Sequence, residues 1–278
     1  MDEKDKQLYE ATLVVESAKQ TAELGKEVVS DVIRPTSKSI GKNIGLLIDG
    51  AFGWLGVWGE KQKIKQQLNL DEFKKTVSEN LETIPEENIK EPTMYIIGPA
   101  IEASKFYYEE NYFREMFAKL IAASCDNRCN DKISPYFVDA IKQITYKEAT
   151  ILTLFKNCSN LPIVNYNLRL KNGGLVYYNK YIFIHDNQNI NYYSDAIVNL
   201  QRLGFVTIDF MNCYTDDKKY QKFIDNQYFV DANNEILKGE NDAEYNVSKI
   251  DIEKGLIEIT PLGKNFIDLC LWFLIVLL

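Results

Sequence analysis

Hydrophobic residues recur at helical spacing over the first half of the chain. Between residues 3 and 34 they alternate in steps of three and four, and most are small: Leu8, Ala11, Val15, Ala18, Ala22, Gly25, Val29 and Val32. This heptad pattern predicts one long helix that ends at Pro35 and that a partner helix can approach closely. Such a helix packs in the chain's own core or forms a self-association surface.

Further helices are predicted up to residue 144. The segment 61–84 is charged but carries apolar residues at helical spacing, and Pro85 ends it. A helix from about Met94 contains Pro99, which implies a kink or a helix start there. Asn111 is a candidate cap for the next helix, and Ser134-Pro135 begins another that runs through Ile144.

The pattern changes after residue 145, where strand signals join the helical ones. Thr145-x-x-Glu148 is a capping box at the start of a helix. The next elements are predicted to be a strand at 175–184, a helix at 194–203 ended by Gly204, a strand at 205–210, a helix at 216–230, a strand at 256–259, and a last helix capped by Thr260-Pro261.

The expected fold class is therefore mainly α, with an α+β C-terminal part. We expect an N-terminal helical bundle over residues 1–144, followed by a winged-helix-like domain over residues 145–278. The order of helix, Leu-Gly, strand, insert, strand, Thr-Pro-x-Gly and helix resembles a winged helix-turn-helix domain.

The segment 40–59 combines six of the 14 glycines with aromatic and apolar residues. Each glycine inside a helix costs about 1 kcal/mol relative to alanine, so close packing or refolding is the expected reason for them. One interpretation is a tight buried hairpin between two helices, and the other is a membrane-active or switching element. The candidate interaction residues are Gly45, Gly53, Trp54, Gly56 and Trp58.

Composition narrows the possible functions. The chain has 278 residues and a net charge of −8, which argues against a dedicated nucleic-acid binder. Acidic residues outnumber basic ones over 145–278 as well. If the winged helix nevertheless read DNA, its contacts would come from Asn199, Gln201 and Arg202.

Residues for catalysis are scarce. His185 is the single histidine, which excludes sites with two His ligands and most Ser-His or Cys-His pairs. Five cysteines at irregular spacing indicate reduced thiols, and no phosphate-loop or nucleophile-elbow motif occurs. We therefore expect no catalytic residues, no metal, no cofactor and no enzyme activity.

Targeting signals are also missing from the sequence. The N-terminus lacks a basic stretch followed by an apolar one, and no run reaches the ~20 apolar residues of a spanning helix. The expected location is cytoplasmic, with membrane association on activation as an alternative. Residues 269–278 are ten apolar residues that either dock on the core or touch a membrane peripherally.

Five strings, taken together and in this order, resemble one protein family. They are IPEENIKEPTMYIIGPAIEASKF (84–106), REMFAKLIAAS (114–124), ISPYFVDAIKQI (133–144), NLQRLGFV (199–206) and ITPLGKNFIDLC (259–270). They resemble the bacterial abortive infection alpha family (Abi-alpha) over roughly residues 30–270. The resemblance implies a role in defence against bacteriophage, in which an infected cell stops growing or dies before the phage matures.

Two functional hypotheses follow from the resemblance and the composition. The first is a non-enzymatic effector or sensor of phage defence that acts by protein or membrane interaction, with a protein partner or self-association. The second is a winged-helix transcriptional regulator that binds DNA. Glu102, Arg114 and Glu115 lie in the family strings, and we predict structural ion-pair or helix-end roles for them.

Overall fold

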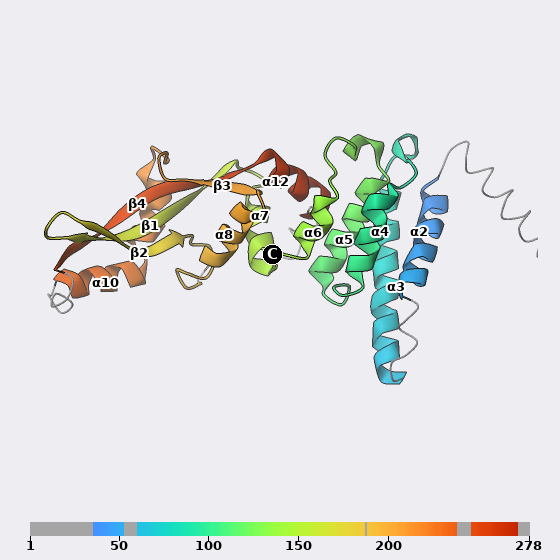
Figure 1. Ribbon diagram of the computed structural model, residues 1–278, viewed down its shortest axis with the longest axis horizontal. Coiled ribbons are helices and arrows are strands. Elements are labelled where there is room, and N and C mark those ends of the chain that lie inside the picture. The colour runs from blue at the N-terminus through green and yellow to red at the C-terminus, as the bar shows by residue number, and fades with distance from the viewer. Residues whose placement is uncertain (1–35, 53–59, 187, 238–245, 272–278) are drawn as a thin grey trace, which may run out of the picture. The chain divides into compact units, whose positions relative to one another are not determined.

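The computed structural model describes residues 36–52, 60–186, 188–237 and 246–271 (Figure 1). The long helix predicted over residues 3–34 lies outside these ranges. Contacts divide the chain into two compact units. Unit 1 comprises Met1–Arg114 with Ile121–Asp131, and unit 2 comprises Glu115–Leu120 with Lys132–Leu278.

Unit 1 is helical in the part of the chain that the structure describes. Its main helices are α2 (Ser37–Phe52), α3 (Glu60–Glu82), α4 (Met94–Ser104) and α5 (Asn111–Ser124), the last with residues in both units. Pro99 lies inside α4 rather than at its start. Asn111 is the first residue of α5, whose N-cap is Glu110, so the predicted Asn111 cap is wrong.

The core of unit 1 follows from the helical spacing of its apolar residues. Helix α2 buries every fourth residue: Ile40, Ile44, Ile48 and Phe52. Helix α3 contributes the fully enclosed Phe73, and the two rings of Phe52 and Phe73 lie 6.4 Å apart between centroids. Tyr108 meets Phe52 edge-on at 5.0 Å, which closes this core with a preferred aromatic geometry.

Unit 2 mixes helices and strands. In chain order its elements are α6 (Tyr136–Ile141), α7 (Tyr146–Leu154), β1 (Asn160–Leu170), β2 (Leu175–Ile182), α8 (Ser194–Arg202), β3 (Val206–Asp209), a 3-10 turn (Asp217–Tyr220), α9 (Gln221–Ile224), α10 (Gln227–Leu237), β4 (Val247–Ile259), α12 (Pro261–Phe266) and a π-helical turn (Ile267–Leu271). The expected fold class, mainly α with an α+β C-terminal part, is confirmed.

The four strands form one antiparallel sheet in the order β2-β1-β4-β3. The two longest strands, β1 and β4, pair along almost their whole length, from Asn160 opposite Glu258 to Leu168 opposite Ile250. Strand β1 was not predicted, and it occupies the interior of the sheet. The winged-helix arrangement is not confirmed, because β4 pairs mainly with β1 rather than with β3 alone.

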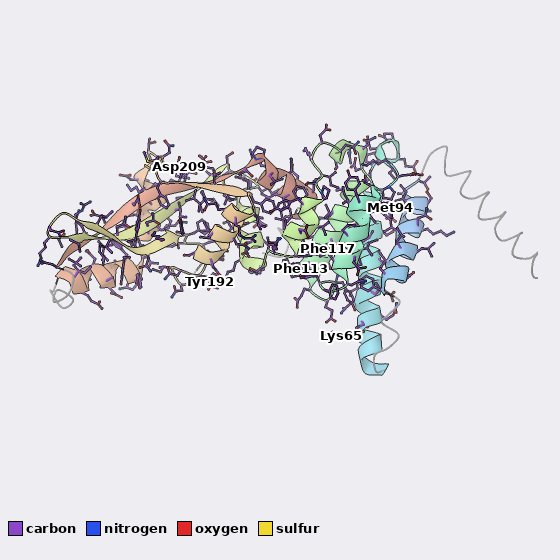
Figure 2. The ribbon with its side chains drawn as sticks, in the orientation of Figure 1. Lys65, Met94, Phe113, Phe117, Tyr192 and Asp209 are labelled. Carbon is purple, nitrogen blue, oxygen red and sulfur yellow. The ribbon has the colours of Figure 1, made fainter. Side chains whose placement is uncertain are left out.

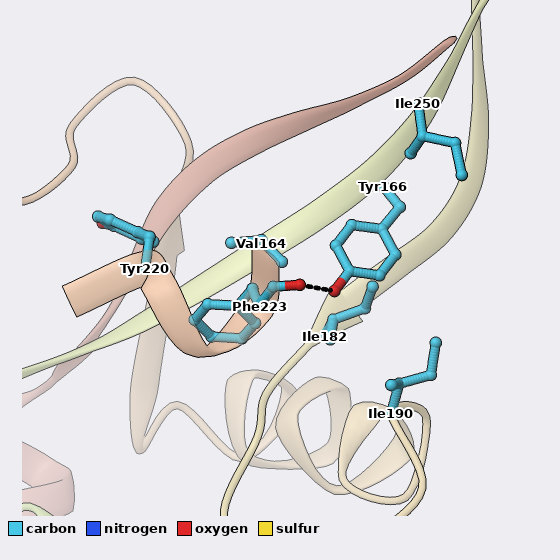
Figure 3. Close-up of a cluster of buried hydrophobic side chains, with 7 residues drawn as sticks. All are labelled: Val164, Tyr166, Ile182, Ile190, Tyr220, Phe223 and Ile250. Carbon is cyan, nitrogen blue, oxygen red and sulfur yellow. Dashed lines mark hydrogen bonds between the residues drawn. The ribbon is translucent and has the colours of Figure 1, made fainter. Parts of the chain in front are cut away.

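One face of the sheet is covered by α9, α10 and the turn before them. The buried residues of this cluster, shown in Figure 3, are Val164, Tyr166, Ile182, Ile190, Tyr220, Phe223 and Ile250. Tyr166 Oη donates to the carbonyl oxygen of Phe223 at 2.7 Å, so the buried hydroxyl keeps a partner. This core occupies the face to which Val164 and Tyr166 point.

Local sequence signals account for the ends of several helices. The capping box predicted at Thr145 and Glu148 is present at the start of α7. Thr260 accepts a hydrogen bond from the Gly263 amide at 3.0 Å and begins α12. Helix α8 ends at Arg202, and Gly204 follows with a φ of 72°, the left-handed conformation that favours glycine.

Candidate functional site

The face of the sheet opposite this core carries a ladder of polar side chains. In a strand, successive side chains point to opposite faces. Because Val164 and Tyr166 of β1 point into the core, Asn165, Asn167 and Arg169 point to the opposite face. The polar face, as we call it, consists of Asn165, Asn167, Arg169, Lys249, Asp251 and Glu253.

Strand register arranges these residues in three rows. Asn165 lies opposite Glu253, Asn167 opposite Asp251, and Arg169 opposite Lys249, all across the β1–β4 pairing. On the other side of β1, strand β2 adds Tyr177 beside Asn167 and Leu175 beside Arg169. Side chains that lie opposite or diagonally across an antiparallel pair are close enough to interact, so the three rows can form one connected set of contacts.

The carboxylate of Glu253 is held by side-chain amides from the first and second rows. Asn165 Nδ2 donates to Glu253 Oε2 at 2.8 Å, and Asn167 Nδ2 donates to the same oxygen at 3.3 Å. Asn165 Oδ1 accepts from the backbone N–H of Tyr181 at 2.9 Å. Both asparagines are almost fully buried, with 4% and 2% of their surface exposed.

The second carboxylate is compensated by cations. Lys249 Nζ lies 2.7 Å from Asp251 Oδ1, and Arg169 Nε donates to Asp251 Oδ2. These hydrogen bonds, from Lys249 first and then Arg169, lower the pKa of Asp251. Asp251 therefore stays ionised at neutral pH, and its charge is matched within the face.

Aromatic side chains border the polar face. Strand β2 bulges against β1, and Tyr181 has a φ of 57° at this irregularity. Its ring centroid lies 6.3 Å from that of Phe210. Tyr177 is 55% exposed, and Lys180 Nζ lies 3.8 Å from the centroid of its ring. The ring of Tyr177 thus already attracts one cation within the chain.

Phe210 is placed by the turn that ends β3. Asp209, labelled in Figure 2, accepts from the Met211 amide at 2.6 Å and from the Asn212 side chain at 2.6 Å. Phe210 then packs on Gly255 of β4, where an added Cβ would lie 2.6 Å from Phe210 Cδ1. Only glycine leaves room for this ring at the border of the polar face.

The polar face was not predicted, because strand β1 was not recognised in the sequence. The signal was present, since residues 164–169 alternate between the apolar Val164, Tyr166 and Leu168 and the polar residues of the opposite face. This period of two is typical of a half-buried strand. Pro162 within the strand and the turn at Asn172 obscured it.

The residues considered for DNA contact are engaged inside unit 2. Asn199 Nδ2 donates to the Gln143 carbonyl oxygen at 2.8 Å and to Glu148 Oε1 at 2.9 Å. Arg202 donates to Asn199 Oδ1 at 2.7 Å and to Gln143 Oε1 at 2.9 Å. Gln201 is exposed. Since two of the three side chains are held by hydrogen bonds within unit 2, the DNA-binding alternative has no support.

Two of the three family-string residues, Arg114 and Glu102, form ion pairs. Arg114 NH2 lies 2.8 Å from Glu72 Oε2 and also donates to Asn111 Oδ1 at 2.9 Å, so it joins α5 to α3. Glu102 pairs with Lys105 one turn later at 2.5 Å. Glu115 is half-buried and acts to raise the pKa of Lys119 on the same helix.

The structure describes only part of the glycine-rich segment 40–59. Gly53, Trp54, Gly56 and Trp58 lie outside the described residues. A Cβ at Gly45 would meet no atom of the described residues within 4 Å. The role predicted for Gly45 in an interaction stays a prediction.

Within the described ranges, no helix combines the length and apolar character needed to cross a bilayer. The same residues contain no group of three His, Cys, Asp or Glu side chains placed to hold a metal ion.

Comparison with known proteins identifies the family. No curated protein matches the chain. An uncharacterized protein from the hydrocarbon-degrading marine bacterium Alcanivorax borkumensis SK2 aligns with a TM-score of 0.30 and 16% identity, over 48% of this chain and 91% of that chain. The family model described as "Abortive infection alpha" matches residues 65–270. That match spans most of the chain, confirms the resemblance noted in the sequence, and places this protein in the abortive infection alpha family.

Proposed function

We propose that this protein is a non-enzymatic effector or sensor of phage defence that acts by binding a protein partner. Its membership of the abortive infection alpha family over residues 65–270 is the observation that carries the proposal. Abortive infection stops phage by halting the infected cell, and a sensor or effector can do this through contacts alone.

The exposed strand β2 supports binding to a protein. It lies at an edge of the sheet, so one row of its backbone N–H and C=O groups faces away from β1. Four consecutive large side chains on it are exposed: Leu175, Val176, Tyr177 and Tyr178, with exposed fractions between 43% and 55%. An edge strand with such side chains is a ready surface for a partner strand.

The test is protection from phage in a sensitive host, with plaques and culture survival as readouts. We expect expression of the chain to reduce plaque number. Val176→Lys should abolish protection, because it places a charge on the binding strand. Val198→Lys on α8 is the matched control, since Val176 and Val198 are both 44% exposed.

Each outcome bears on a different part of the proposal. If wild-type chain gives no protection under native-level expression, the role in phage defence is wrong. If both lysine variants protect as well as wild type, β2 is not the binding element. Thermal melting of each variant separates a lost interaction from a lost fold.

A further inference from the structure

One carboxylate of the polar face has no cation beside it. Glu253 Oε2 accepts from two neutral amides, and Oε1 accepts no hydrogen bond from the described residues. No ion pair joins Glu253 to a lysine, arginine or histidine in that part of the chain, whereas Asp251 on the same strand has two. Glu253 is half-buried, so its charge is only partly solvated.

A second group beside Glu253 also needs a donor. Asn167 is 2% exposed, and its Oδ1 has no hydrogen-bond partner among the described residues. The bond from Asn167 Nδ2 to Glu253 fixes the amide orientation, because the flipped amide would turn one oxygen toward another. A buried acceptor without a donor is costly and rare in native proteins.

These two acceptors define the chemistry of a ligand. A ligand that satisfies both must carry a positive charge and several hydrogen-bond donors. A guanidinium group fits, because it is planar, carries five N–H donors, binds carboxylates in a fork and stacks on aromatic rings. Tyr177, beside Asn167 in the sheet, offers such a ring, and the net charge of −8 attracts a basic partner.

We propose that the polar face binds an arginine side chain of the protein partner, with its guanidinium donating to Glu253 Oε1 and Asn167 Oδ1. Tyr177 lies opposite Asn167 in the sheet and is 55% exposed, so its ring can stack on the entering guanidinium. Arg169, the next residue of β1 on this face, is partly exposed and paired with Asp251, and its side chain has to shift as the ligand reaches Asn167 Oδ1. The inference rests on the proposed function, because it names the chemistry of the partner.

The direct test is a titration of the full-length, ¹⁵N-labelled protein with N-acetyl-arginine methylamide. The readouts are the side-chain amide signals of Asn165 and Asn167, assigned by their loss in Asn165→Leu and Asn167→Leu. We expect saturable shifts of both. N-acetyl-citrulline methylamide has nearly the same shape without the charge, and it should give no saturable shift.

Substitutions at the carboxylate sharpen the test. Glu253→Gln keeps an acceptor for the two amides and should weaken arginine binding about tenfold or more, because it removes a charged hydrogen bond. Glu258→Gln, five positions along β4, is the matched control and should leave binding unchanged. Equal melting temperatures verify that both variants are folded.

The proposal is overturned if citrulline and arginine shift the amides alike, or if Glu253→Gln binds as tightly as wild type. It is also overturned if Glu258→Gln weakens binding as much as Glu253→Gln does. If the protein protects against phage but shows no arginine-specific shifts, the arginine site is wrong and the proposed function stands. If arginine-specific shifts occur without any protection, the proposed function is wrong and the arginine site stands.

Discussion

The side chain of Asn199 on α8 donates to the buried carboxylate of Glu148 on α7 across 2.9 Å. The other Glu148 oxygen accepts from the Thr145 amide at 2.8 Å, so one carboxylate both caps its own helix and holds the next one. Only 5% of the Glu148 surface is exposed. This contact therefore holds α7 and α8 together.

Asn199→Ala should lower the free energy of unfolding by about 1–3 kcal/mol, because it leaves a buried carboxylate oxygen without its donor. Urea unfolding measures the change. Gln201→Ala on the exposed side of α8 is the control and should stay within about 0.5 kcal/mol of wild type. Equal effects of both substitutions would contradict a stabilising role of the contact between Asn199 and Glu148.

Arg114→Ala should lower the free energy of unfolding by about 1–2 kcal/mol. The side chain is 11% exposed and links α5 to Glu72 of α3, so its loss removes packing as well as an ion pair. Lys75→Ala breaks the exposed pair with Glu79 and should change little. Lost phage protection at an unchanged melting temperature would instead make Arg114 a functional residue.

Gly45→Ala should raise the free energy of unfolding by about 0.5–1 kcal/mol. The glycine lies inside α2, and a Cβ there meets no atom of the described residues within 4 Å, so the helix gains propensity without a clash with them. Thermal melting measures the gain. A clear drop would restore close helix packing as the reason for this glycine.

Gly263→Ala should act in the opposite direction. Its Cβ would lie 2.3 Å from the Phe205 carbonyl oxygen and 2.6 Å from Ile259 Cδ1, so α12 must shift away from the sheet. We expect a loss of about 1–3 kcal/mol or more in urea unfolding. A neutral result would mean that α12 moves without cost.

Lys119→Met should stabilise the protein at neutral pH. Burial lowers the pKa of Lys119 from its usual 10.5 to about 8, although Glu115 and Cys270 act to raise it. Between these two pH values the unfolded chain binds more protons than the folded one, so wild-type stability rises with pH. The advantage of Lys119→Met, about 3 kcal/mol at most, should fade from pH 8 to 10.5.

Urea unfolding of both proteins at several pH values, with a reductant to protect the thiols, measures this difference. A difference that stays constant across the range would place the Lys119 ammonium in a solvated environment.

Local signals predicted local structure well. Thr145 with Glu148, Gly204, and Thr260 before Pro261 each act within one helical turn, and each lies where the pattern indicated. Strand β2 was also found, because its aromatic and β-branched run is dense. These features depend on residues close together in the sequence, so local patterns are enough to predict them.

Pairing between strands far apart in the sequence could not be predicted from local patterns. The strand β1 has its hydrogen-bond partners in β4, and the polar face exists only where the two meet. Asn165 and Asn167 look like surface residues in the sequence, yet Glu253 and the neighbouring strands bury them. Likewise, Asn199 and Arg202 resemble exposed reading residues until Gln143 and Glu148 are placed beside them.

The pairing of β1 with β4 has a consequence for synthesis on the ribosome. Asn165 and Glu253 are 88 residues apart in the sequence, so β1 emerges long before the strand that completes it. At roughly 5–20 residues per second, the wait is roughly 4–18 s. Throughout that time the apolar side of β1 lacks its sheet neighbour. Slow closure of such distant strands makes the nascent chain prone to aggregation and a natural client for chaperones.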